Sequence, residues 1–241
     1  MHRHFTRRVL LSTIGALALA AGLGGAMAQA KLPIGIIGAG NIGAGIGALW
    51  IKAGHPVMFS SRNPDELSDL VAKLGPLAKA GTVAQAIAFG DALFIAVPYA
   101  ALPQIGADYK DALKGKIILD ANNAVPARDG EAIVKEADTN GIGITSQKYL
   151  AGTRLVRAFN TVGAKIFETQ AGRPDPKFGI PIAGDDPEAV RVASELVRDA
   201  GFDPVVAGGL ASARKFQQRG GGAYGFQGTA ADLKAKLDSI P

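Results

Sequence analysis

The stretch "IGIIGAGNIG", residues 34–43, gives the strongest indication of fold in this chain. A short apolar run leads directly into glycines at GxGxxG spacing, and a helical pattern begins at Asn41. In a strand–turn–helix unit the first glycine permits the tight turn, the second lets the backbone approach a pyrophosphate, and the third allows close packing of helix on strand. The helix start adds unpaired N–H groups and a positive dipole end. This stretch predicts a dinucleotide site formed by Gly38, Ala39, Gly40, Asn41, Ile42 and Gly43, and the alternative is a glycine-rich turn without a ligand.

A second stretch, "MFSSRNP" (58–64), lies where the next strand ends, about 22 residues after Gly38. Sites that prefer NAD usually place a carboxylate here to bind the ribose 2′-hydroxyl, and a carboxylate would repel a 2′-phosphate. Here the residues are Ser60, Ser61 and Arg62, and the first acid is Asp65. Two hydroxyls and a guanidinium suit a phosphate. We therefore predict NADP(H) as the cofactor; the alternative is that Arg62 is a solvated residue beside the next helix.

Beyond Lys31, short apolar runs alternate with helical patterns. The predicted strands are 32–38, 55–61, 91–98, 116–122, 154–160, 177–184 and 202–208, and the predicted helices are 41–54, 63–75, 82–90, 100–113 and 187–200. Buried strands alternating with helices indicate an α/β fold, a Rossmann-like, doubly wound and mainly parallel sheet with helices on both faces. We expect an NADP-binding domain over 31–150 and a smaller C-terminal portion, 151–241, on the same sheet. That portion would bind the acceptor and end in a glycine-rich loop (219–229) and a last helix.

Composition excludes several classes of protein. The net charge of +5 falls to near balance without residues 1–30, which leaves 23 basic and 21 acidic residues, so no nucleic-acid partner is expected. The chain has no cysteine, and its three histidines, His2, His4 and His55, are scattered, so no metal site is expected. We find no Ser-His-Asp arrangement or paired carboxylates, and we nominate no catalytic acid or base.

Residues 1–30 have the pattern of an export signal. A basic start is followed by an apolar run of about 15 residues and by small residues that suit cleavage after Ala28 or Ala30. The run is shorter than the ~20 residues that span a bilayer, so no stable membrane anchor is expected after cleavage. The pair Arg7-Arg8 before "VLL" resembles a twin-arginine signal, with the general secretory route as the alternative. We expect an exported, periplasmic protein.

With these residues located, the chain resembles the NADPH-dependent coenzyme F420 reductases, a family of F420-dependent NADP oxidoreductases. The resemblance covers residues 32–215 and rests on the order of its motifs: "IGIIGAGNIG", "GHPVMFSSRNP" (54–64), "FIAVPY" (94–99), "DANN" (120–123), "RAFNTV" (157–162), "IPIAGDD" (180–186) and "AGGLASAR" (207–214).

The resemblance implies direct hydride transfer between NADPH and a small-molecule acceptor ring. It implies that Val97 and Pro98 border the nicotinamide, and that Asn160 and Thr161 lie near the second substrate. In the family an apolar helix follows "LASAR", whereas here "KFQQRGGGAYGFQGT" (215–229) is polar and glycine-rich. The acceptor therefore stays open between a deazaflavin, a flavin, a quinone and a ferric chelate, and a homodimer stays open too.

Two other classes of function compete with this one. A β-hydroxyacid or imine reductase would share the first domain but needs a helical second domain of about 100 residues, whereas strands are predicted after Asn160. A sensor or scaffold that binds NADP(H) without oxidising it remains an alternative.

Overall fold

The computed structural model describes residues 1–2 and 31–241, and Lys31–Pro241 form one compact unit. The predicted export signal lies almost wholly outside the described residues. Within them, no helix combines the length and the hydropathy needed to cross a membrane.

A single eight-stranded sheet forms the centre of this unit, in the order β3-β2-β1-β4-β5-β6-β7-β8. Neighbouring strands are parallel except for β6 and β7, which are antiparallel. The strands are β1 Ile34–Ile37, β2 Val57–Ser60, β3 Ala78–Gly81, β4 Ala92–Ile95, β5 Ile117–Asp120, β6 Arg154–Arg157, β7 Gly179–Gly184 and β8 Asp203–Gly208.

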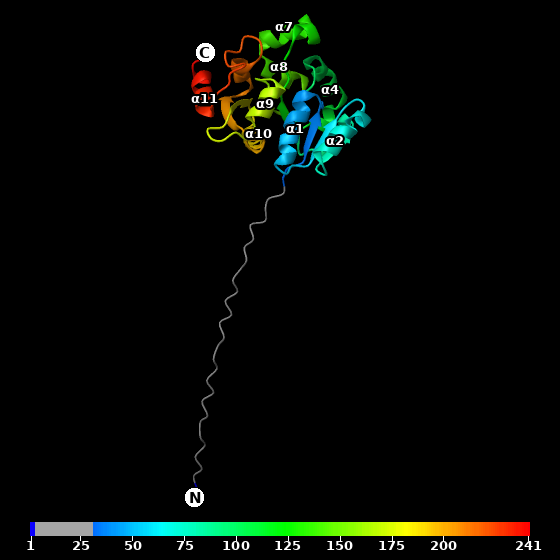
Figure 1. The fold of residues 1–241 in the computed structure, drawn as a ribbon, viewed down its shortest axis with the longest axis vertical. Coiled ribbons are helices and arrows are strands. Elements are labelled where there is room, and N and C mark those ends of the chain that lie inside the picture. Colours follow the sequence, from blue (N-terminus) through cyan, green and yellow to red (C-terminus); the bar gives the residue numbers. More distant parts are fainter. Residues whose placement is uncertain (3–30) are drawn as a thin grey trace. The chain divides into compact units, whose positions relative to one another are not determined.

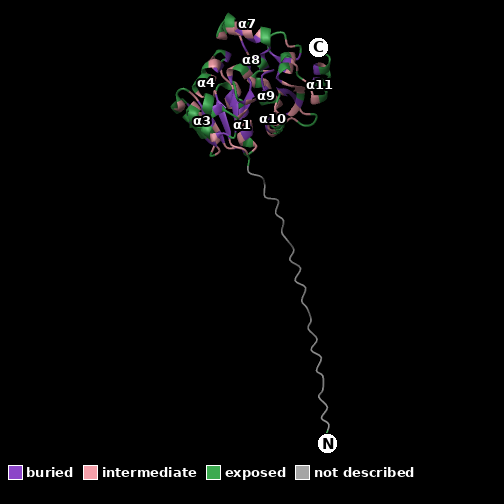
Figure 2. Ribbon diagram, turned by 180° about the vertical axis from the view of Figure 1, so that it is seen from behind, coloured by how far each residue is buried: buried purple, intermediate pink, exposed green. Residues whose placement is uncertain are grey.

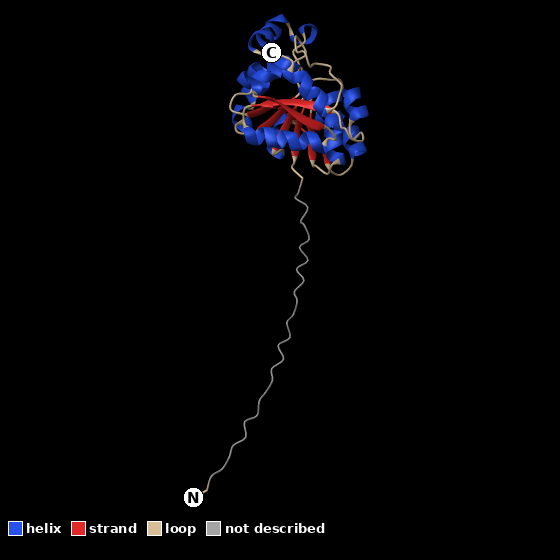
Figure 3. Ribbon diagram, turned by 90° about the vertical axis from the view of Figure 1, so that its left-hand side faces the viewer, coloured by secondary structure: helices blue, strands red, loops and turns tan. Residues whose placement is uncertain are grey.

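Helices cover both faces of the sheet, as Figure 3 shows edge-on. One face packs against α1 Asn41–Lys52, α2 Ser68–Leu74, α9 Ala164–Gln170 and α10 Pro187–Asp199 (Figure 1). The other packs against α3 Val83–Phe89, α4 Leu102–Asp108, α5 Lys110–Leu113, α7 Glu131–Asn140, α8 Ile142–Tyr149 and α11 Ala230–Asp238. Short helical turns complete the set: η1 Pro64–Leu67, η2 Tyr99–Ala101, α6 Pro126–Asp129 and η3 Leu210–Phe216.

The strands are buried on both sides (Figure 2) because alternate side chains enter two separate cores. In β4, Phe94 packs in the core of the first face, while Leu93 and Ile95 pack in the core of the second. This two-residue alternation with apolar residues on both faces is what a parallel sheet covered by helices requires. The fold class expected from the sequence is confirmed.

Several elements differ from the sequence expectation. Strand β3 was not predicted, because Ala-Lys-Ala-Gly lacks the β-branched and aromatic residues that mark strands; its pairing with β2 produces it. Helices α7, α8 and α9 were also missed. The helix expected over 100–113 is interrupted at Tyr109, which lies between α4 and α5. The predicted strands begin or end up to three residues beyond the observed ones.

The segment 151–241 adds β6, β7 and β8 to the same sheet. The expected strands after Asn160 are present as β7 and β8, with α9, α10 and α11 as the helices. No additional helical domain follows Asn160 in the described residues. The polar stretch 217–229 is largely irregular and precedes α11, as expected.

Candidate functional site

The glycine turn joins the carboxyl end of β1 to the start of α1. Gly38 has a φ of +101°, and a Cβ there would lie 2.4 Å from the carbonyl oxygen of Ala96. A Cβ on Gly43 would lie 1.9 Å from the carbonyl oxygen of Gly38. Folding therefore accounts for both of these glycines.

Gly40 differs from Gly38 and Gly43, the other two glycines of the turn. It caps α1 with an extended backbone, φ −73° and ψ −172°, which any residue can adopt, and a Cβ there would meet no atom within 4 Å. Neither conformation nor packing requires a glycine at this position. The space beside Gly40 is therefore open for a ligand to approach the backbone closely.

A pocket of about 350 Å³ lies against this turn, at the carboxyl ends of β1, β4 and β5. The chain leaves β1 toward β2 on one side, and β4 lies on the other. In doubly wound sheets this reversal of strand order is where ligands bind. The lining residues are Gly40, Asn41, Ile42, Ala96, Val97, Pro98, Ala121, Asn122, Asn123, Val125, Arg128 and Gln218.

The three residues predicted to bind a 2′-phosphate do not share one environment. Ser60 is fully buried and its hydroxyl donates to the carbonyl of Ile36 at 2.8 Å, so its side chain belongs to the sheet. Ser61 is partly exposed and accepts from the amide of Asn63, and Arg62 is exposed with no side-chain partner among the described residues. We therefore revise the expectation for the Ser60 side chain and keep Ser61 and Arg62 as candidates.

Buried polar residues beneath the pocket lining connect the strand ends that form it. Asp120 and Arg157 are both wholly buried, and their side chains lie 2.6 Å apart. Arg157 also donates to the carbonyl of Asn122, whose amide N–H donates to Asp120 at 2.9 Å. The Asn122 side-chain oxygen in turn accepts from the Val97 amide at 2.7 Å. These bonds join the carboxyl ends of β4, β5 and β6.

Arg128 is the charged residue of the pocket lining. Its guanidinium is about half exposed and pairs with the buried Asp129 at 2.8 Å. Burial would raise the pKa of Asp129, but the bonds from Arg128 and from the amides of Val125 and Ala100 together lower this pKa below its ordinary value. Asp129 therefore stays ionised, and it holds Arg128 at the rim.

Asn160 and Thr161 lie behind the rim rather than on the pocket surface. Both are 2% exposed and neither lines the pocket. The Asn160 amide donates to the carbonyl of Phe216 at 3.1 Å, and the Thr161 carbonyl accepts from Gly225 at 2.9 Å. As placed here they anchor the C-terminal segment, and direct contact with a substrate stays a prediction.

The residue before Asn160 has an unusual backbone. Phe159 has a φ of +58°, which costs of order 1–3 kcal/mol for such a residue. Its ring packs edge-on against Trp50, Phe94 and Phe167, with centroids 5.6–5.9 Å apart. This aromatic packing holds the turn that brings Asn160 toward Asn123.

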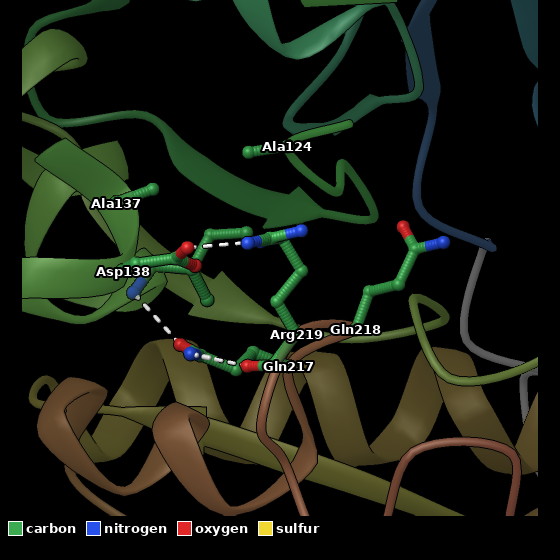
Figure 4. A pocket seen from close by; sticks show the side chains of 7 residues that line it. Ala124, Ala137, Asp138, Gln217, Gln218 and Arg219 are labelled. Atoms are coloured by element: carbon green, nitrogen blue, oxygen red, sulfur yellow. Dashed lines mark hydrogen bonds and ion pairs between the residues drawn. The ribbon is translucent and has the colours of Figure 1, made fainter. Parts of the chain in front are cut away.

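The C-terminal segment reaches the pocket through Gln218. Figure 4 shows its neighbours Gln217 and Arg219 tied to the α7–α8 region, where Gln217 accepts from the Ile142 amide and Arg219 pairs with Asp138 at 2.8 Å. The Gln218 side chain extends away from this cluster. The polar stretch therefore contributes Gln218 to the lining of the pocket.

The site offers binding groups rather than proton-transfer groups. Tyr99, next to Pro98, is wholly buried, and burial raises the pKa of its hydroxyl far above the ordinary value. No cluster of His, Cys, Asp and Glu that could hold a metal ion occurs among the residues described. Such a site can align two bound molecules, which is the main requirement of hydride transfer between them.

Residues 33–124 match the family model for "NADP oxidoreductase coenzyme F420-dependent". This stretch contains the glycine turn, the "SSR" stretch and most of the pocket lining. The resemblance to this family that the sequence motifs predict is thereby confirmed over residues 33–124.

Two known reductases are similar to this chain over about three quarters of its length. The chain is 29% identical to rat metalloreductase STEAP3 over 187 residues, 76% of this chain and 35% of that protein. It is 27% identical to the F420-dependent NADP reductase of Methanothermobacter marburgensis over 193 residues, 75% and 85% of the two chains. This chain thus spans about a third of the metalloreductase and most of the archaeal reductase.

Among solved structures, a hypothetical protein from Sinorhizobium meliloti superposes with a TM-score of 0.72 at 28% identity, covering 83% of this chain and 97% of that one. The similarity extends over nearly the whole length of that protein. It therefore includes the C-terminal portion and confirms the fold beyond the family-matched segment.

Four polar residues of the pocket lining were not predicted from the sequence: Asn122, Asn123, Arg128 and Gln218. "DANN" follows a predicted strand, and polar residues at such a strand end were a usable signal for the two asparagines. Arg128 and Gln218 carry no comparable signal, because their places depend on turns that only the folded chain defines.

Proposed function

We propose that this protein is an NADPH-dependent oxidoreductase that transfers hydride to a small-molecule ring acceptor. The family match, the archaeal F420-dependent NADP reductase and the rat metalloreductase all support an NADP-linked reductase. When bound, NADP(H) supplies the hydride. The turn 38–43 would hold its pyrophosphate, Ser61 and Arg62 its 2′-phosphate, and Val97 and Pro98 would border its nicotinamide.

The observation that carries this proposal is the open space beside Gly40. Gly38 and Gly43 are explained by the fold itself, whereas Gly40 has an ordinary backbone and no neighbour for a side chain to meet. The α1 N-terminus beside it presents amide groups with the partial positive charge that phosphates prefer. A dinucleotide explains both the glycine and the pocket that begins there.

The variant Gly40→Ala tests this explanation. We expect its melting temperature to stay close to that of the parent protein, because the methyl group meets no protein atom. NADPH binding should weaken about tenfold, since a methyl group forced against close-packed atoms costs roughly 1–3 kcal/mol. Calorimetric titration with NADPH measures the dissociation constant.

Gly163→Ala is the matched control for this variant. Gly163 also caps a helix with an extended backbone, φ −76° and ψ 161°, and a Cβ there would also meet nothing within 4 Å. It does not line the pocket. If both variants bind NADPH as the parent does, the space beside Gly40 does not hold the cofactor.

Activity requires a separate experiment with a panel of acceptors. The purified chain is mixed with NADPH and a deazaflavin, a flavin, a quinone or a ferric chelate, and absorbance at about 340 nm follows NADPH oxidation. Oxidation with one acceptor above the enzyme-free rate supports the oxidoreductase. NADPH binding without oxidation by any of them supports the alternative of a sensor or scaffold.

We further propose that residues 1–30 export the protein to the periplasm, with a homodimer still an open expectation. The pattern of Arg7-Arg8, apolar run and small residues supports this proposal. Replacing Arg7-Arg8 by Lys-Lys should leave the full chain in the cytoplasm, and fractionation followed by immunoblotting measures the distribution. Unchanged export would favour the general secretory route, and a parent chain found only in the cytoplasm would contradict export.

A further inference from the structure

We propose that Asn122 is a positioning residue for the cofactor, acting through the backbone of Val97. This inference rests on the proposed function, because it concerns the part of the pocket assigned to the nicotinamide. Asn122 was not predicted as a site residue, yet it lines the pocket and is 3% exposed.

Asn122 is held rigidly by its own backbone. Its amide donates to Asp120 and its carbonyl accepts from Arg157, and those two side chains form a wholly buried ion pair. A buried pair of this kind allows little rearrangement, because moving either charge leaves the other without compensation. The position of the Asn122 side chain is therefore set by β5 and β6.

The side chain of Asn122 transmits that position to β4. Its Oδ1 accepts from the Val97 amide at 2.7 Å, immediately past the end of β4 at Ile95. Val97 and Pro98 both line the pocket. The amide of Val97 lies beyond the last strand residue that pairs with β1, so the bond to Asn122 takes the place of a strand partner there. Without it this wall is free to shift.

The bond also fixes the orientation of the Asn122 amide group. A backbone N–H can only donate, so the oxygen must face Val97, and Nδ2 is left without a partner among the described residues. The oxygen alone performs the positioning. A side chain of the same shape that keeps the oxygen and lacks the nitrogen should therefore replace asparagine.

The test compares Asn122→Ala and Asn122→Asp for binding of NADPH and of 2′,5′-ADP, the half of the cofactor that lacks the nicotinamide. Asn122→Ala should weaken NADPH about five- to tenfold, the range of one hydrogen bond, and leave 2′,5′-ADP within about twofold. Asn122→Asp should recover most of the lost NADPH affinity, because its carboxyl oxygen accepts from Val97 in either protonation state. Gln147→Ala is the control: it removes another side-chain amide, one that donates to the backbone carbonyls of Leu150 and Thr153, and it should change the binding of neither ligand.

The outcomes separate the possibilities. Equal weakening of both ligands by Asn122→Ala would show a general loss of structure, and unchanged NADPH affinity would show that the Val97 bond does not matter; either overturns the proposal. Failure of Asn122→Asp to recover affinity would point to direct contact through Nδ2 and would also overturn it. A parent protein that binds neither ligand contradicts the proposed function itself.

Discussion

Replacing Arg157 by methionine should destabilise the protein by about 3–5 kcal/mol, because it leaves the carboxylate of Asp120 buried without a counter-charge. Both side chains are wholly buried and lie 2.6 Å apart. For a chain of this length the loss corresponds to a fall in melting temperature of roughly 6–20 °C. Differential scanning calorimetry of the parent and Arg157→Met measures it. Methionine keeps much of the apolar volume, so the charge is the main change.

Two further variants identify the cause. Arg154→Met removes another arginine of β6, whose pair with Asp186 is solvent-exposed at its edges and holds the pKa of Asp186 at about 2. Exposed pairs contribute little to stability, so its melting temperature should fall far less. Adding Asp120→Asn to Arg157→Met removes the buried charge and should restore part of the loss. An Arg157→Met protein as stable as Arg154→Met would contradict an energetically important buried pair.

Replacing Arg62 by alanine should weaken NADPH binding by roughly 10- to 100-fold, because hydrogen bonds to a charged group contribute about 1.5–3 kcal/mol. Binding of NADH, which lacks the 2′-phosphate, should change by no more than about twofold. Arg62 is exposed, and its side chain forms no hydrogen bond or ion pair with another described residue, so its replacement removes no such contact within the described fold. Titration of both dinucleotides at low and high salt measures the difference, since screening reduces the contribution of an exposed charge.

Arg198→Ala is the matched control for Arg62→Ala. Arg198 is also exposed, and it precedes Asp199, which pairs with Lys31 ahead of the amino end of β1, away from the glycine turn. Replacing Arg198 should leave the dissociation constants of NADPH and NADH unchanged. The comparison therefore distinguishes a specific contact with the 2′-phosphate from the effect of lowering the net charge. If Arg62→Ala weakens the binding of NADPH and NADH equally, Arg62 does not bind the 2′-phosphate.

The parts predicted correctly from sequence depend on local patterns. The glycine turn identifies itself because its spacing, the strand before it and the helix after it are contiguous, and the alternation of strands and helices predicts the parallel sheet. Strand β3 escapes prediction because pairing with β2 overrides a sequence without strand-forming residues. The position of a residue in the sequence does not fix the direction of its side chain. Ser60 lies at the expected strand end, yet its hydroxyl donates to the carbonyl of Ile36.

The remaining site residues could not be predicted because contacts between distant segments place them. Arg157 in "RAFNTV" gives no sign of a buried partner 37 positions earlier at Asp120. Gln218 reaches the pocket only because Gln217 and Arg219 bind residues near position 140. Polar residues in loops have no periodic pattern, so such contacts are visible only in the folded chain.

After β8 the chain returns beside β6 before it reaches the pocket. The amide of Leu210 donates to Asp185, whose neighbour Asp186 pairs with Arg154 at the start of β6. At the other end of η3, the carbonyl of Phe216 accepts from Asn160, past the end of β6. Helical turn η3 therefore runs along β6 before Gln218 reaches the pocket. In the proposed function, NADP(H) would lie against the turns after β1, β4 and β5, whereas the acceptor side would come from this returning loop. Mutations in the loop would then alter what is reduced while the electron donor stays the same, so the two specificities could evolve separately and be exchanged separately by grafting.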